Sequence, residues 1–297
     1  MSLRIKALRG FAIAITVLNI LGHTVLGFEQ SLLQLFVSLF TAYLCEILIE
    51  LSDAVINKRT PAFYGSINKA ISFLLPAHIT GLAIGMLIYS GDNILPFAFA
   101  SALAITSKTL INARINGKVR HFLNPSNTGI ALTLLLFPWV SIAPPYHFTE
   151  HIYEYGDIVL PIIILILGSI LNTKLTKRTP LIIAWFLGFA FQAIIRSLVT
   201  DISLVGALLP VTGLAFLLFT FYMITDPGTT PIKPFNQVMF GFSVALVYGV
   251  LMLFHVVFTL FFALLIVCVI RGTYHLVKGK INLNNKEGAL CQQELQS

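Results

Sequence analysis

The sequence predicts an all-α polytopic membrane protein with about ten transmembrane helices and with both termini in the cytoplasm. Three observations predict this fold class: the composition, a series of apolar runs, and the placement of the basic residues. Of the 297 residues, 57% are hydrophobic and only 10% are charged, whereas soluble globular chains carry about 25% charged residues. A helix of about 20 apolar residues crosses the hydrocarbon core of a bilayer.

The apolar runs define ten candidate spans in order along the chain. The first run follows the basic start "MSLRIKALRG" and lacks a convincing cleavage site, so we expect a retained span rather than a signal peptide. The last two runs are separated only by the weak break at "LFHVV", so nine spans remain possible. The candidates cover about residues 10–27, 31–51, 70–89, 94–107, 127–142, 158–171, 180–198, 202–222, 236–253 and 255–270.

The basic residues indicate the orientation. With the N-terminus inside, every Lys and Arg except Arg196 falls on the inner side, as expected of a multi-pass protein of the cell (inner) membrane. We place Arg196 at the outer end of a span as a snorkelling side chain. The net charge of +7 follows the topology and does not indicate nucleic-acid binding. Residues 1–281 are predicted to form one transmembrane domain, and residues 282–297 a polar cytoplasmic tail.

Two predicted spans are short. The runs "ILPFAFASALAITS" and "IVLPIIILILGSIL" each carry a proline near the outer end. Short or proline-interrupted segments are typical of the half-helices that surround binding sites in transporters. Tilting of the neighbouring helices with local thinning of the bilayer is the alternative.

A polar loop on the predicted inner side leads into the fifth span. It reads "RHFLNPSNTG", and Asn124, Ser126 and Asn127 are residue types that cap helix N-termini, with Pro125 suited to the first turn. Capping accounts for only part of this cluster, and Lys108, Arg114, Lys118 and Arg120 lie just upstream. Free amides beside basic side chains favour an anion such as phosphate, or the carbonyl oxygens of a heterocycle.

A second polar loop follows the eighth span on the same side. It reads "FYMITDPGTTPIKP", and "DPG" alone is an ordinary turn. The residues that we single out are Thr225, Asp226, Pro227, Thr229 and Thr230. Two proline-fixed polar loops at one side of a bundle predict a pocket that both of them form.

The two loops together resemble a known family. "ITSKTLINARINGKVRHFLNPSNTGI" and "FYMITDPGTTP" are similar to two motifs of the RnfD/NqrB family of membrane subunits, and they occur in the family's order. The chain looks closest to its stand-alone UnbU-like branch, whose members are often labelled enediyne biosynthesis proteins. The resemblance implies a ten-span bundle similar to urea transporters that holds flavin within a redox-driven ion pump.

One motif of the family is missing from this sequence. Pump subunits of the family attach FMN to a threonine in an S/G-A-T-type loop, and this sequence has no such motif; Thr149 and Thr179 lack its context. We therefore expect riboflavin or FMN to bind non-covalently. The expected roles are positive charge from Lys108, Arg114, Lys118 and His121, and hydrogen bonds to the ring edge from Asn124, Ser126, Asn127, Asp226 and Thr229.

Other function classes stay open at this stage. A transporter, a channel or a non-redox small-molecule binder would use the same bundle, and an accessory subunit would only assemble with partners. In a redox role, partner proteins would have to bring electrons, because the sequence lacks iron–sulfur ligands. Assembly into a homo-oligomer is a further possibility. We find no catalytic pair and no metal-ligand spacing, and enzymatic activity is left undecided.

Two carboxylates are candidates for an ion pathway. Glu46 and Glu50 are four residues apart near the inner end of the second span, so they share one helix face. Intramembrane carboxylates are functional candidates, and pairing with Lys or Arg at a helix end is the alternative. His23 and His78 are expected to bond to neighbouring groups rather than to a metal.

Overall fold

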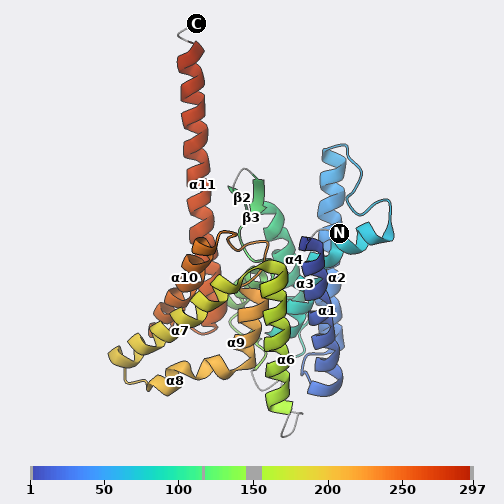
Figure 1. Cartoon of the computed structure of the whole chain (residues 1–297). Coiled ribbons are helices and arrows are strands. Elements are labelled where there is room, and N and C mark those ends of the chain that lie inside the picture. The colour runs from blue at the N-terminus through green and yellow to red at the C-terminus, as the bar shows by residue number, and fades with distance from the viewer. Residues whose placement is uncertain (1–2, 116–117, 145–155, 295–297) are drawn as a thin grey trace.

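The computed structural model describes residues 3–115, 118–144 and 156–294, and helices make up most of this part of the chain. The helices pack into one bundle, from which the last helix projects toward the C-terminus (Figure 1). They are α1 (Leu3–Leu21), α2 (Leu32–Ile56), α3 (Ile67–Leu87), α4 (Leu95–Leu110), α5 (Pro125–Leu136), α6 (Gly156–Ile170), α7 (Thr179–Val199), α8 (Leu204–Leu208), α9 (Leu214–Leu218), α10 (Pro234–Leu253) and α11 (Thr259–Glu294).

Short elements extend or connect these helices. Three π-helical turns prolong α1, α6 and α9, and one 3-10 turn prolongs α8: η1 (Gly22–Leu26), η3 (Leu171–Thr176), η5 (Phe219–Met223) and η4 (Leu209–Thr212). Two antiparallel strand pairs join distant ends of the helices. They are β1 (Ile88–Tyr89) with β4 (Ser141–Ile142), and the hairpin of β2 (Asn112–Ile115) with β3 (Lys118–His121).

The predicted class, a multi-pass α-helical membrane protein, is confirmed, whereas the predicted number of spans is only partly matched. A helix lies in each of the ten predicted ranges. Within the described residues, seven helices are long and apolar enough to cross a membrane, or eight if a bent pair counts as one span. The helices α4, with 16 residues, and α5, with 12, are too short for that test.

The prediction of two short spans is right for the fourth and wrong for the sixth. The π-helical turn η3 continues α6, so this span runs over 19 residues, Ile158–Thr176. The fifth segment is short instead. It ends at Leu136, one residue before Phe137, because Pro138 follows and the residue before a proline disfavours helical backbone.

The eighth segment is a broken helix. Leu204–Thr212 and Leu214–Met223 meet at an angle of 64°. Gly213, between them, has extended backbone angles (φ −79°, ψ 141°), and Pro210 lies in the first part. A proline lacks the N–H that continues a helix, so the break has a local cause in the sequence.

The short helix α5 is held tightly against α4. A Cβ atom at Gly129 would lie 2.3 Å from the carbonyl oxygen of Ala100 and 2.9 Å from the Cβ of Ala104. Only a glycine allows the two backbones to approach this closely. This contact fixes the start of α5, and with it the polar loop at residue 124.

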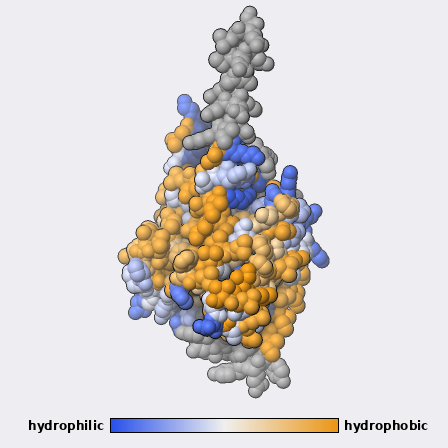
Figure 2. Space-filling view, turned by 90° about the vertical axis from the view of Figure 1, so that its left-hand side faces the viewer, coloured by the Kyte–Doolittle hydropathy of each residue, from blue (hydrophilic) through white to orange (hydrophobic). Residues whose placement is uncertain are grey.

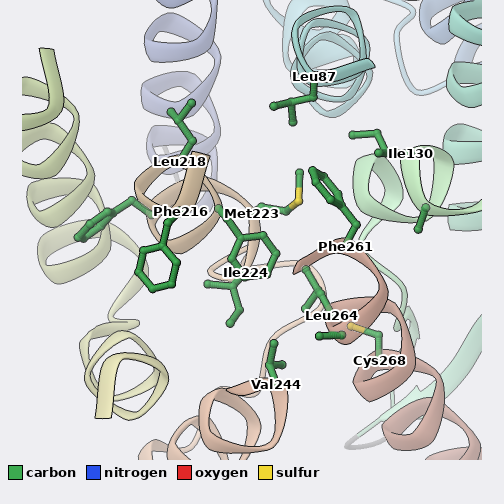
Figure 3. Close-up of a cluster of buried hydrophobic side chains, with 14 of the residues drawn as sticks. Leu87, Ile130, Phe216, Leu218, Met223, Ile224, Val244, Phe261, Leu264 and Cys268 are labelled. Atoms are coloured by element: carbon green, nitrogen blue, oxygen red, sulfur yellow. The ribbon is translucent and has the colours of Figure 1, made fainter. Parts of the chain in front are cut away.

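The main core lies between the later helices. Trp185, Phe189 and Phe216 are fully or almost fully buried, and their rings contact one another. Side chains from α3, η5 and the start of α11, among them Leu87, Met223 and Phe261, belong to the same cluster (Figure 3). The core therefore joins the first five helical segments to the last five.

Large apolar side chains also cover the outside of the bundle. Leu33, Phe36 and Phe40 of α2 and Ile183 and Leu187 of α7 are exposed. Figure 2 shows one face on which apolar residues dominate and hydrophilic residues lie mostly at the margins. Such a surface fits contact with the hydrocarbon region of a bilayer.

Two regions outside the predicted spans are the C-terminal tail and the acidic loop between the fifth and sixth spans. The helix α11 continues as backbone helix to Glu294, so the predicted tail from residue 282 begins as an extension of the last span. Most of the acidic loop "APPYHFTEHIYEYGD", including Thr149, lies outside the described residues.

Candidate functional site

The most prominent site is a cavity of about 720 Å³ between two groups of helices. The helices α1 and α3 line it on one side, and α6, η3, α9 and η5 line it on the other. Most of its wall is apolar, with the aromatic side chains of Phe11, Phe219, Tyr222 and Phe261. Both the volume and the apolar lining are those of small-molecule and cofactor sites.

The cavity reaches the outer surface of the bundle between α1 and α6. Ile13 and Val17 of α1 and Ile163 and Leu167 of α6 line the cavity and are also exposed on the outside. Farther along, the two segments close on each other at Gly10, where a Cβ atom would lie 2.8 Å from Cδ2 of Leu171. An apolar ligand therefore has a path into the cavity from the bilayer.

Polar groups gather at one end of the cavity, where the two predicted loops meet. Asn124 caps α5 as predicted, because its Oδ1 accepts a hydrogen bond of 3.0 Å from the backbone N–H of Asn127. Its Nδ2 donates a bond of 3.0 Å to the carbonyl oxygen of Met223, at the end of η5. Asn124 is thus both a helix cap and the bridge between the two loops.

Asn127 fastens the same region to the last span. Its side chain is 1% exposed, and Nδ2 donates to the carbonyl oxygen of Phe261 at 3.0 Å. Asn127 does not line the cavity. The bond to Phe261 holds this side chain against α11, and its expected bond to a ligand stays a prediction.

The loop that follows η5 is closed by its own hydrogen bonds. Oδ1 of Asp226 accepts from the N–H of Gly228 at 3.0 Å, and Oδ2 accepts from Oγ1 of Thr229 at 2.9 Å. Oγ1 of Thr225 and Oγ1 of Thr230 donate to the carbonyl oxygens four residues earlier, at 2.8 and 2.6 Å. Within this loop, Asp226 organises the turn while its side chain also borders the cavity.

The predicted site residues fall into two groups. Those that line the cavity are Lys108, His121, Asn124, Pro125, Ser126, Asp226 and Pro227. Thr225, Thr229 and Thr230 are buried beside it and do not line it. Arg114 is exposed on β2 and does not line the cavity, so the structure does not place its charge at the site. The side chain of Lys118 lies outside the described part of the structure.

Lys108 has a partner that the sequence analysis did not assign. Its Nζ lies 2.5 and 2.7 Å from the two carboxylate oxygens of Glu46, which is on α2. The Lys108 and Glu46 side chains are only 21% and 11% exposed. The predicted alternative of a lysine-paired helix end is therefore confirmed for Glu46, and Lys108 brings no unbalanced charge to the cavity.

The face of α2 that carries Glu46 is not a continuous polar path. Ser38 bonds to Ser101 at 2.8 Å farther toward the other end of the span. Between Ser38 and Glu46 lies a buried apolar contact of Ala42, Ala77 and Ile105. An ion that moved along this face would have to pass that contact.

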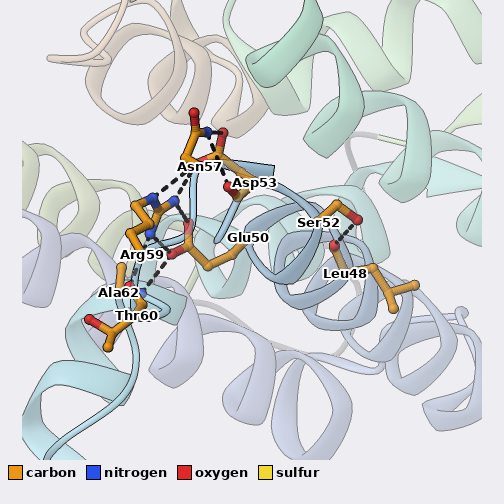
Figure 4. Close-up of polar contacts among 8 residues, drawn as sticks. All are labelled: Leu48, Glu50, Ser52, Asp53, Asn57, Arg59, Thr60 and Ala62. Atoms are coloured by element: carbon orange, nitrogen blue, oxygen red, sulfur yellow. Dashed lines mark hydrogen bonds and ion pairs between the residues drawn. The ribbon is translucent and has the colours of Figure 1, made fainter. Parts of the chain in front are cut away.

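Glu50 belongs to a separate, more exposed cluster. It accepts a two-pronged bond from Arg59 at 2.5 and 2.9 Å, and Asp53 contacts the same guanidinium (Figure 4). The bonds to Glu50 and Asp53 raise the pKa of Arg59 above its usual range. Glu50 therefore closes the turn after α2, and it does not line the cavity.

Arg178 is a cavity residue that the sequence analysis counted only as an inner-loop charge. It lies between η3 and α7, is 5% exposed and lines the cavity. Burial lowers the pKa of its guanidinium; the charge of Asp226 raises it, and the charges of Arg271 and Arg120 lower it further. "KRTP" has the pattern of an ordinary helix start, so no local signal distinguished this arginine.

The histidines confirm the expectation of neighbour contacts. Nδ1 of His78 lies 2.5 Å from the hydroxyl of Tyr43, and Nε2 lies 2.7 Å from Oγ1 of Thr16. His23 bonds to the carbonyl oxygen of Asn19 at 2.9 Å. In the described residues, no group of three or more His, Cys, Asp or Glu side chains could hold a metal ion.

Arg196 is another exception to the sequence analysis. It is 3% exposed, and its Nε donates to Oε1 of Gln192 at 2.8 Å. The predicted snorkelling position is wrong, because the guanidinium is buried inside the bundle, where Gln192 and the carbonyl oxygen of Ala207 accept hydrogen bonds from it.

Comparison with known proteins does not assign this chain to a family. No protein-family model matches the sequence, and no curated protein is significantly similar to it. The relation to the RnfD/NqrB family is therefore still a prediction that rests on the two loop motifs.

Proposed function

We propose that this chain is an integral membrane protein that binds riboflavin or FMN non-covalently in the cavity, as a subunit of RnfD/NqrB type. The observation that carries the proposal is the polarity of the cavity, which has apolar walls and one polar end. An isoalloxazine ring has the same division, with an apolar dimethylbenzene edge and a pyrimidine edge that carries carbonyl and N–H groups.

The polar end offers hydrogen-bonding groups to such a ring edge. Ser126, His121 and Arg178 line it beside the capped start of α5. Tyr222 also lines the cavity, and its ring contacts Phe11 edge-on at 5.9 Å between centroids. In the described residues no partner bonds to the Tyr222 hydroxyl, which leaves it free for a ligand.

A role in electron transfer coupled to ion movement is part of the proposal. A bound flavin supplies one- and two-electron chemistry, whereas the protein supplies position and electrostatics. Lys108 borders the cavity and holds Glu46. A negative charge in the cavity would draw Lys108 away from Glu46, and that carboxylate would then take up a proton or a cation.

The first experiment is an absorbance spectrum of the protein purified in mild detergent, followed by acid precipitation. Oxidised-flavin bands that pass to the supernatant would support the proposal, and colour retained in the pellet would show covalent attachment and contradict it. A colourless protein that stays empty after incubation with riboflavin and with FMN would refute flavin binding.

Replacement of Tyr222 by Phe tests the site at the level of one oxygen atom. We expect riboflavin affinity to fall roughly 2- to 10-fold, because one hydrogen bond is lost without a change in packing. Tyr248→Phe is the matched control, since Tyr248 is buried beside Phe189 and does not line the cavity. Equal losses in both variants would place the ligand elsewhere.

A transporter, a channel or a non-redox binder is the second candidate. The observation that favours it is the broken pair α8–α9 together with the short helices α4 and α5. Interrupted helices that end at a shared site are typical of transporters. A flavin-free protein that takes up a small molecule into proteoliposomes would support this candidate.

A further inference from the structure

Three arginines surround the loop from Asp226 to Thr230. Arg178 donates to the carbonyl oxygen of Thr230 at 3.5 Å, and Arg271 of α11 donates to the carbonyl oxygen of Thr229. Arg120, on β3, forms the third side. Arginine suits this arrangement because its planar guanidinium presents several donors to one oxyanion.

Two of these arginines border a second, smaller pocket, whereas Arg178 lines the large cavity on the other side of the loop. Arg120 and Arg271 line it together with Gly228, Thr229 and Thr230. Gly228 and Ile232 also line the large cavity, so the two spaces adjoin at this loop. A Cβ atom at Gly228 would lie only 2.8 Å from Nε2 of His121, so a side chain would obstruct this boundary.

The described carboxylates do not balance the positive charge around the loop. Asp226 is the one described carboxylate whose charge acts on Arg178, and both of its oxygens already accept bonds from the loop. Nε of Arg178 is buried, and it has no hydrogen-bond partner in the described residues. A buried guanidinium without a full set of partners costs stability unless an anion completes it.

We propose that this basic pocket binds the phosphate group of a ligand whose ring lies in the large cavity. The ligand class is then a planar phosphomonoester, which among the two flavins selects FMN over riboflavin. This inference rests on the proposed function for the ring, and it adds the residues that hold the phosphate. The connecting chain of the ligand passes Gly228.

A purely structural role of the arginines makes a different prediction for Arg120. Arg178 and Arg271 fasten loop carbonyls, so their loss would disturb the loop with or without a ligand. Arg120 is half-buried and lines the pocket, and its side chain makes no hydrogen bond or ion pair to the described residues. Its replacement therefore removes positive charge without releasing the loop.

The test compares Arg120→Gln with Arg114→Gln in the purified full-length protein. Arg114 and Arg120 belong to the same β-hairpin, but Arg114 is exposed and borders neither space. Affinities for FMN and riboflavin are measured by equilibrium dialysis with flavin fluorescence. We expect the wild type to bind FMN roughly 10- to 100-fold more tightly than riboflavin.

In Arg120→Gln, FMN affinity should fall about tenfold while riboflavin affinity stays unchanged, since only a charge-assisted bond is lost. Arg114→Gln should change neither affinity. Equal affinities of the wild type for both flavins would overturn the phosphate pocket and leave the proposed function intact. The same would follow if Arg120→Gln and Arg114→Gln weakened FMN equally, because the effect would then be one of net charge.

Inorganic phosphate separates the two proposals. It should compete with FMN and raise the thermal midpoint of the wild type but not of Arg120→Gln, compared with chloride at the same ionic strength. If neither flavin binds but phosphate has this effect, the flavin proposal fails and the anion pocket stands. If phosphate has no effect on either protein, the pocket is refuted.

Discussion

The cavity has two charged neighbours that are built in opposite ways. On the side of α2 and α4, Lys108 faces Glu46, and both carboxylate oxygens lie on its ammonium group. On the side of the loop after η5, both carboxylate oxygens of Asp226 accept hydrogen bonds from its own turn, and three arginines lie around this loop. In the first region one positive charge is paired with one negative charge, whereas in the second the positive charges outnumber the negative charge.

The comparison teaches that a basic residue near a cavity is not by itself a ligand-binding residue. Sequence analysis treated Lys108 and the residues of the hairpin as one source of positive charge. The structure separates them by what the nearest carboxylate already binds. A closed pair stabilises the bundle, and an unbalanced cluster is suited to bind an anion, so mutations in the two regions should have different consequences.

The largest expected effect is on stability, from opening the closed pair. Lys108→Ala should lower the free energy of unfolding by about 3 kcal/mol, because it leaves Glu46 as an unpaired, mostly buried carboxylate. Unfolding of the micelle-solubilised protein by SDS measures this loss. The double variant Glu46→Gln with Lys108→Met should recover most of it, since no charge is then left without a partner.

An unchanged stability in Lys108→Ala would contradict the distinction between the two regions. It would show that Glu46 finds water or another partner when Lys108 is removed. The proposed uptake of a proton by Glu46 would then need no movement of Lys108.

The next effect is on binding, at the boundary between the cavity and the basic pocket. Gly228→Ala should weaken FMN about tenfold, because the new methyl group meets the ring of His121 and must displace it. Equilibrium dialysis measures the affinity. Gly279→Ala is the control, since a Cβ atom there meets nothing within 4 Å. Full FMN binding by Gly228→Ala would show that the ligand does not pass this point.

Much of the fold could be predicted because it depends on local patterns. The apolar runs gave the positions of the helices, and Asn124 with Pro125 gave the start of α5. The short fifth helix and the long sixth were missed. Pro138 is a local signal for the end of α5 that the sequence analysis did not use. The π-helical turn at residues 171–176 and the close approach of Gly129 to α4 are consequences of packing, and packing leaves little local signal.

The position of the site could be predicted from the sequence, but the pairing of its charged side chains could not. The two loops meet as expected, through the bond between Asn124 and Met223. The partners Glu46 and Lys108 are far apart in sequence and on different helices. Arg178 and Asp226 are also far apart in sequence, and they lie in two different loops. Which charge is neutralised is decided by these long-range contacts, so composition and loop motifs could not identify Arg178.

The smallest effect should come from a third charged group, in which the basic side chain and one of its two carboxylate partners are more exposed. Arg59 contacts Glu50 and Asp53, as Lys108 contacts Glu46, but the Arg59 and Asp53 side chains are 38% and 51% exposed. Water and salt screen exposed pairs. Arg59→Gln should therefore lower the thermal midpoint much less than Lys108→Ala does, and high salt should remove the difference from the wild type. A loss as large as that of Lys108→Ala, and independent of salt, would mean that closure of the turn after α2, rather than burial, decides what an ion pair contributes.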